Sequence, residues 1–145
     1  MDNRAVSREL ISFFMEMGKA FKEYSHNEKD SIITHQQFLT IANLKHLGKR
    51  GLKEISKDMK VSTSSLCIML NKLVESGYAQ RETDPNDRRN TLYSITEKGE
   101  ELFEEEVDKK LYYIDVIIDK LSEESKEKFY NSIIQLKEIV KEIEE

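Results

Sequence analysis

The feature that most constrains the fold is a break between two helical periods in the middle of the chain. Apolar residues recur at helical spacing over residues 52–61 and again over residues 66–74, and the two periods separate near Lys60. Two short helices joined by so tight a break are typical of a helix-turn-helix. Ser62 is expected to cap the second helix by accepting a hydrogen bond from an amide near Ser65.

Two strand-like runs follow this helix pair. The second helix should stop at Gly77, where a left-handed conformation costs little, and residues 78–83 and 91–95 then flank a turn-rich segment at 84–90. A hairpin with arginines at its tip, directly after a helix-turn-helix, predicts a winged helix-turn-helix.

At the hairpin the sequence resembles a known family. The run Asp84-Pro85-Asn86-Asp87-Arg88-Arg89, followed by Leu92, Ile95-Thr96 and Gly99, is similar to the wing signature of MarR-type bacterial transcriptional regulators. Length and element order agree over nearly the whole chain, although motif-level detail is confined to residues 52–99. The resemblance implies a regulator of transcription that binds DNA and responds to a small molecule.

The flanks of this region predict long helices. Apolar residues follow helical spacing over residues 4–24, and again over two helices after Thr96, the second of them capped by Ser122. We therefore expect a mostly α fold with a small β-hairpin wing, forming one MarR-type domain over residues 1–145. Its winged helix-turn-helix would cover about 34–99, and long N- and C-terminal dimerisation helices would cover about 4–24 and 97–144.

A further helix is predicted before the helix-turn-helix. Thr34 and Gln37 have the spacing of a capping box, and Gly48 marks the end of the helix. The residues expected to face inward on this helix are Phe38, Ile41, Ala42, Leu44 and Leu47. The Gly-Lys-Arg-Gly run at 48–51 allows a short strand or a turn, and its two cations allow either a phosphate contact or a solvated loop.

Composition excludes several classes of protein. The chain has one cysteine, Cys67, so it holds no internal disulfide, and no apolar run is long enough to span a bilayer. No signal-peptide pattern opens the chain, and the expected location is the cytoplasm. No cofactor loop or catalytic constellation is evident, so we expect neither a cofactor nor an enzyme. No metal is expected, because the spacing of His26, His35 and His46 is not that of metal ligands. The nearby carboxylates Glu28 and Asp30 are the alternative, since they could complete a metal site.

The charge is unevenly distributed. The net charge is −5, but residues 48–99 contain ten basic and seven acidic side chains, whereas residues 100–145 contain seven and fifteen. Because the local field governs approach to DNA, the acidic overall balance does not exclude binding to phosphate.

The second helix of the pair is expected to enter the major groove. Its side chains predicted to contact DNA are Ser62, Thr63, Ser64, Ser65, Cys67, Ile68, Asn71 and Lys72. Hydroxyls donate to phosphates or base edges, and Asn71 pairs with adenine if it reaches the floor of the groove. Ile68 stands where the family commonly has a basic or polar residue, which favours thymine-methyl contacts and DNA shape over guanine readout. Cys67 is interpreted as an inert small residue rather than an oxidant sensor.

The wing supplies the remaining predicted contacts. In the proteins that this chain resembles, the aspartate of an Asp-x-Arg unit orients an arginine that enters the minor groove; Asp87 and Arg89 stand at these positions, beside Arg88. The alternative is a salt bridge that only stabilises the wing. Arg81 is expected to contact phosphate or to pair with neighbours of Glu82.

A small-molecule pocket is predicted from the resemblance and from the supply of aromatic residues. The candidates for a crevice between the dimer helices and the winged core are Phe13, Met17, Phe21, Phe38, Tyr112 and Tyr113. The same side chains also suit a simple hydrophobic core.

The apolar faces of the terminal helices exceed what one small winged core covers, which predicts a homodimer. Two winged units related by a twofold axis would read a palindrome whose half-sites lie roughly 10 base pairs apart. The hypothesis is a repressor that occupies such an operator and responds to a small aromatic or other apolar effector. The alternative is a winged-helix module for protein-protein contact, whose wing arginines bind acidic partners.

Overall fold

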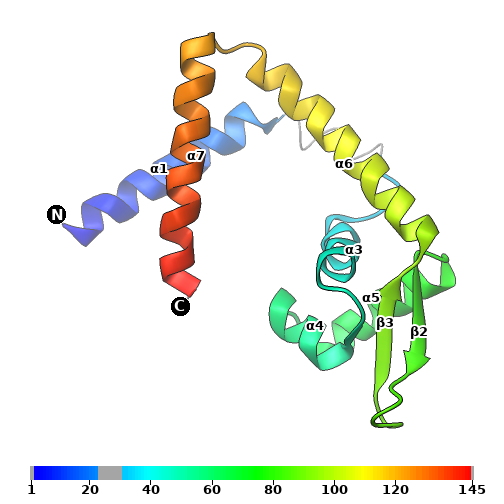
Figure 1. Cartoon of the computed structure of the whole chain (residues 1–145). Coiled ribbons are helices and arrows are strands. Elements are labelled where there is room, and N and C mark those ends of the chain that lie inside the picture. Colours follow the sequence, from blue (N-terminus) through cyan, green and yellow to red (C-terminus); the bar gives the residue numbers. More distant parts are fainter. Residues whose placement is uncertain (1, 23–30, 145) are drawn as a thin grey trace. The chain divides into compact units, whose positions relative to one another are not determined.

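The computed structural model describes residues 2–22 and 31–144, which fall into two compact units (Figure 1). One unit comprises Asp30–Lys109 and is called the winged unit below. The other comprises Met1–Lys29 and Lys110–Glu145 and is called the helical unit. The predicted His26, Glu28 and Asp30, and the end of the first predicted helix at Tyr24, lie outside the described residues.

The helical unit contains α1 (Asn3–Ala20), the end of α6 (Glu97–Ile118) and α7 (Glu123–Glu144). The side chain of Asp2 caps α1 by accepting a hydrogen bond from the amide of Arg4 at 3.1 Å. The predicted cap of α7 is confirmed, because the Ser122 hydroxyl accepts from the amide of Ser125 at 3.2 Å. No side chain of α1 is buried within the chain.

Three short helices form the body of the winged unit: α3 (His35–Leu47), α4 (Leu52–Met59) and α5 (Thr63–Glu75). The predicted capping box is present at α3, where Thr34 accepts from the amide of Gln37 and the Gln37 side chain accepts from the amide of Thr34. Between α4 and α5, Lys60 adopts a left-handed conformation with φ of 53°. This single residue produces the break in helical period seen in the sequence.

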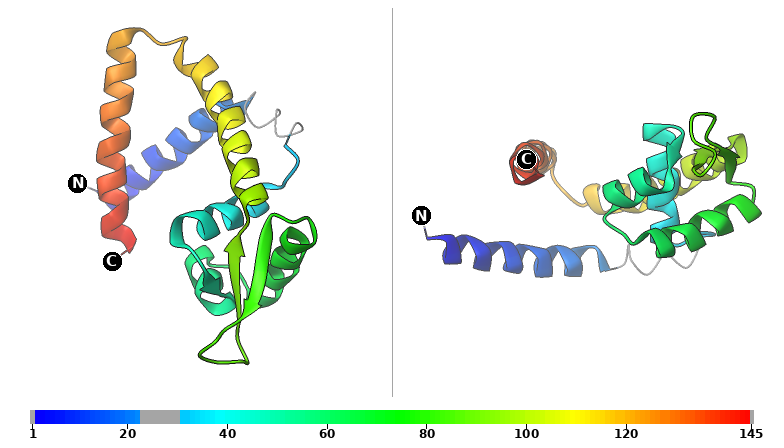
Figure 2. Two further views of the ribbon diagram at one scale, coloured as in Figure 1. Left: turned by 45° about the vertical axis from the view of Figure 1, so that its right-hand side comes forward. Right: turned by 90° about the horizontal axis from the view of Figure 1, so that it is seen from below.

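A small antiparallel sheet completes the winged unit, with strand order β1-β3-β2. Its strands are β1 (Arg50–Gly51), β2 (Ala79–Thr83) and β3 (Thr91–Ile95), so the run at 48–51 forms a short strand. The β2–β3 hairpin projects beyond the helices of its unit (Figure 2). Gly77 precedes β2 with φ of 80°, the left-handed conformation predicted for it.

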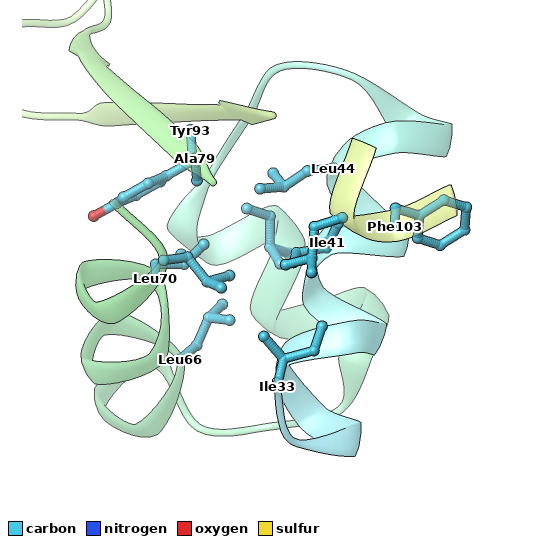
Figure 3. Packing of buried hydrophobic residues seen from close by; sticks show 11 residues of the cluster. Ile33, Ile41, Leu44, Leu66, Leu70, Ala79, Tyr93 and Phe103 are labelled. Atoms are coloured by element: carbon cyan, nitrogen blue, oxygen red, sulfur yellow. The ribbon is translucent and has the colours of Figure 1, made fainter. Parts of the chain in front are cut away.

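The hydrophobic core of the winged unit lies between α3, α5, the sheet and the start of α6 (Figure 3). Its fully buried apolar side chains are Ile41, Leu44, Ile55, Leu66, Leu70 and Leu73. The inward orientation predicted for Leu47 is wrong, because this side chain is 55% exposed. At 3.6 residues per turn, Leu47 is rotated by about 120° from Ile41, and it lies in the last turn of α3, where the core has ended.

Candidate nucleic-acid interface

The N-terminus of α5 presents a cluster of exposed hydroxyl groups. The Ser62 hydroxyl accepts from the amide of Ser65 at 3.2 Å, which confirms the predicted cap, and lies 2.9 Å from the hydroxyl of Ser65. Thr63 and Ser64 are exposed beside them. Amides at a helix start carry partial positive charge, so hydroxyls and amides here together form a surface suited to phosphate.

The outward face of α5 continues from these hydroxyls toward its C-terminus. Ile68 is 61% exposed and Lys72 is exposed, while the opposite face is held in the core by the buried leucines. The turn before the helix is fixed by Ser56, whose hydroxyl donates to the carbonyl of Val61 at 2.6 Å. An exposed apolar side chain flanked by polar groups is what a thymine methyl contact requires.

One flank of α5 faces the wing. The Arg81 guanidinium of β2 donates from Nη1 to Oδ1 of Asn71 at 3.1 Å. On the other side of the same amide, Nδ2 of Asn71 lies 3.9 Å from Sγ of the half-buried Cys67. Arg81 therefore pairs with the helix rather than with a neighbour of Glu82, and the phosphate contact expected for it stays a prediction.

The tip of the wing is shaped by two aspartates. Oδ1 of Asp84 accepts from the amide of Asn86 at 2.8 Å, and Oδ1 of Asp87 accepts from the amide of Arg89 at 3.1 Å. Asp87 also lies 3.7 Å from Nε of Arg89, whose side chain is 93% exposed. The Asp87 carboxylate therefore lies beside Nε of Arg89 and leaves the far end of the guanidinium open to solvent. The neighbouring Arg88 is also exposed.

Two cations near the wing are neutralised within the unit. Nζ of Lys49 lies 2.6 Å from Oε1 of Glu82. Arg50 is largely buried and pairs with Asp58 and with Glu54 of α4, and it donates to Asn43 of α3. Sequence reasoning missed this arginine as a link between β1 and two helices, although one partner, Glu54, lies only four residues later on the adjoining helix.

A cavity of about 530 Å³ opens between the wing, the start of α4 and α5. Its lining includes Lys53, Cys67, Arg89 and Tyr93. Tyr93 is 5% exposed, its hydroxyl points out of the hydrophobic cluster, and burial raises its pKa (Figure 3). The phenol is therefore neutral at physiological pH and keeps a donor at this surface.

Comparison with known proteins relates this geometry to a family. The family model described as "MarR family" matches residues 33–91, which include α3, α4, α5 and the wing tip. This stretch of the chain is therefore similar to the MarR family.

Two curated relatives of this chain come from Bacillus subtilis (strain 168). The HTH-type transcriptional regulator MhqR is 26% identical over 126 residues, which cover 84% of this chain and 87% of that protein. The uncharacterized HTH-type transcriptional regulator YwhA is 29% identical over 89 residues, which cover 61% of this chain and 64% of YwhA.

Solved structures share the fold. A MarR family protein from Bacillus stearothermophilus superimposes with a TM-score of 0.81 at 21% identity. The superposition covers 97% of this chain and 99% of that protein. NadR, solved in complex with 4-hydroxyphenylacetate, superimposes with a TM-score of 0.68 at 22% identity. This superposition covers 92% of this chain and 89% of NadR.

The residues predicted for an effector pocket are divided between the two units of the chain. Phe38 stacks on Phe103 in the winged unit, with ring centroids 5.3 Å apart. The helical unit contains the other five, Phe13, Met17, Phe21, Tyr112 and Tyr113. A second cavity of about 510 Å³, which sequence reasoning did not find, lies between α3 and α4 and is lined partly by Leu39, His46 and Leu47.

One buried charge was also missed. Glu106 of α6 is 2% exposed, and it accepts from the Ser31 hydroxyl at 2.6 Å and from Nζ of Lys109 at 2.9 Å. Burial by itself would raise the pKa of Glu106, but the hydrogen bonds from Ser31 and Lys109 outweigh it and hold the pKa below its usual value.

Within the described residues, no group of three or more histidine, cysteine, aspartate or glutamate side chains is placed to hold a metal ion. None of the helices in the same part of the chain combines the length and apolar character needed to cross a bilayer.

Proposed function

We propose that this protein is a sequence-specific, double-stranded DNA-binding regulator of transcription of the MarR type that acts in the cytoplasm as a homodimeric repressor. The observation that carries the proposal is the pair of exposed features on one unit, the hydroxyl-rich start of α5 and the arginine-tipped wing. Both lie in the only region of the sequence, residues 48–99, whose charge balance is positive.

In this proposal the two features contact the two grooves of the duplex. The start of α5 enters the major groove, where Ser62, Thr63, Ser64 and Ser65 contact phosphates and base edges. Arg89 reaches into the minor groove, where the negative potential of a narrow groove favours a guanidinium. Asp87 contacts Nε and the amide of Arg89 and so limits the conformations of this side chain before binding. Arg89 therefore loses less conformational entropy when it binds DNA.

The helical unit supports the proposal of a homodimer. Its large apolar side chains are exposed on α1, on the end of α6 and on α7; those at least 50% exposed include Leu10, Ile11, Phe14, Met15, Leu111, Tyr112, Ile139, Val140 and Ile143. Monomeric proteins rarely expose apolar surface on this scale. A second copy of the chain would cover the corresponding faces of both protomers and would present two wings to a palindromic operator.

A small aromatic effector is proposed from the chemistry of five side chains of the helical unit and of Phe38 in α3. Phe13, Met17, Phe21, Phe38, Tyr112 and Tyr113 supply rings and a thioether suited to an aromatic ligand. NadR, which shares the fold, binds 4-hydroxyphenylacetate. We extend to this chain the class of compound, a small aromatic acid, and expect its binding to change the affinity for the operator.

The proposal is tested by titrating labelled intergenic DNA from around the gene with the purified protein at several salt concentrations. The affinity of wild type should fall steeply as salt rises, because phosphate contacts release counterions. Arg89→Ala should weaken operator binding by about fivefold to hundredfold while helicity and dimer mass stay unchanged.

Arg8→Ala is the matched control, because it removes an exposed arginine from α1, outside the winged unit. It should leave operator affinity within about twofold. A wild-type protein that binds every duplex equally, or none, would refute the regulator and favour a winged-helix module for protein-protein contact.

A further inference from the structure

A hydrogen bond joins the wing to α5. Arg81 of β2 donates from Nη1 to Oδ1 of Asn71 at 3.1 Å, across ten residues of sequence. Arginine has only donors, so the atom of the Asn71 amide that faces it must be the oxygen. The contact therefore fixes which end of the amide points toward the wing.

The opposite end of the amide is directed along α5. Nδ2 of Asn71 lies 3.9 Å from Sγ of Cys67, one helical turn earlier. Sulfur is a weak acceptor, so this contact leaves the amide nitrogen free to donate to a stronger partner. Asn71 is half-buried, which limits its rotation, whereas Arg81 is exposed and keeps four of its five donors for a phosphate.

This orientation conflicts with the usual way in which asparagine reads a base. A bidentate contact to adenine needs the amide oxygen to accept from N6 and the amide nitrogen to donate to N7, with both atoms facing the base edge. Because the hydrogen bond directs the amide oxygen of Asn71 toward the wing, the amide nitrogen is the atom that Asn71 presents to the groove. Guanine presents two acceptors there, N7 and O6, whereas adenine presents the acceptor N7 beside the donor N6, so a donor from the protein is better matched to guanine.

We propose that Arg81 is a positioning residue for specificity: it sets the amide of Asn71 so that α5 selects an acceptor edge, guanine in preference to adenine, at one position of each half-site. This inference rests on the proposed function. Arg81 itself contacts the sugar-phosphate backbone and reads no base. A residue of the wing thus decides which base is read by a residue of the helix.

The test is a selection from a randomised duplex library with the full chain, read as base preference at each half-site position. The variants are Arg81→Met, Asn71→Ala and the double variant Arg81→Met/Asn71→Ala. Methionine keeps an unbranched stem but has no donor. Arg81→Met should raise adenine relative to guanine by about fivefold or more at one position, because the freed amide can turn. In the Asn71→Ala background the same change should leave that position unaltered.

Glu82→Gln is the matched control, because it weakens an exposed ion pair on the same strand, with Lys49, that does not involve α5. Its base preferences should equal those of wild type. The inference is overturned if Arg81→Met lowers the affinity for all duplexes equally, or if it shifts the base preference by the same amount in the Asn71→Ala background. Either result leaves the proposed DNA-binding function intact. If wild type enriches no sequence, the proposed function falls, and the inference falls with it.

A second measurement needs no DNA. In the free protein, the side-chain amide resonances of Asn71 should move when Arg81 is replaced by methionine, and should stay in place in Glu82→Gln. Unchanged Asn71 resonances in Arg81→Met would show that the hydrogen bond does not set the amide, which also overturns the inference.

Discussion

Gly99, in the first turn of α6, is a position where one added methyl group should damage the winged unit. A Cβ at Gly99 would lie 2.1 Å from the carbonyl oxygen of Tyr78 and 2.8 Å from Cγ1 of Ile95. The first contact is with backbone, so a side-chain rotation cannot relieve it. The two segments would have to separate by about 0.9 Å to reach even 3.0 Å.

That separation breaks contacts that join α6 to the base of the wing. The Tyr78 carbonyl accepts from the amide of Thr96 at 3.1 Å, and the Thr96 hydroxyl donates to the Gly77 carbonyl at 2.5 Å. Overpacking costs about 1–3 kcal/mol and a lost hydrogen bond about 1 kcal/mol, while alanine regains up to about 1 kcal/mol of helix propensity. Gly99→Ala should therefore lower the free energy of unfolding by about 1–3 kcal/mol.

The assay is urea unfolding followed by circular dichroism, with all variants at one protein concentration because association also contributes to stability. The control is Gly18→Ala in α1, where a Cβ would meet nothing within 4 Å. That variant should be more stable than wild type by up to about 1 kcal/mol. If Gly99→Ala proves as stable as wild type, the close approach of α6 to the wing is wrong.

Three further predictions address single contacts. Ser62→Ala should cost about 1 kcal/mol of stability in urea unfolding through loss of the α5 cap, whereas Ser62→Asp should keep the cap but weaken DNA binding in a titration, because it adds negative charge at a phosphate surface. Glu106 has a lowered pKa in the folded protein, so it stabilises the fold above its unfolded pKa and this contribution is lost as the pH falls through the folded pKa. In urea unfolding, Glu106→Gln should cost about 1–2 kcal/mol at pH 7, and the difference from wild type should shrink below about pH 4; a constant difference would contradict the ionised state. Arg50→Met should destabilise the fold by about 1–2 kcal/mol because it leaves two carboxylates unpaired, while the exposed Lys53→Met should change stability by less than about 0.5 kcal/mol.

Local features of the fold were predictable from the sequence. The caps at Thr34, Ser62 and Ser122 are confirmed because each hydroxyl accepts a hydrogen bond from the amide three positions later. The break at Lys60 was visible because one left-handed residue shifts the phase of the apolar residues on either side. Such signals depend on neighbours in the chain, so the sequence alone carries them.

Contacts that depend on strand register were not predictable. Arg81 lies opposite Tyr93 in the β2–β3 pair, and this register decides that its side chain meets Asn71 rather than a neighbour of Glu82. Lys49, expected either near a phosphate or in a solvated loop, pairs with Glu82 of β2, and its phosphate contact stays a prediction. The inward position of Leu47 failed because spacing alone does not tell where the core ends.

The order of the strands has a consequence for how the protein resists aggregation. β3 lies in the centre of the sheet, so β2 forms an edge whose outer side has no strand partner among the described residues. This edge is only five residues long and carries the exposed Gln80, Arg81 and Glu82. Short, charged edges are poor templates for strands of other molecules. The hairpin can therefore project into solvent in a crowded cell without recruiting its neighbours into a shared sheet.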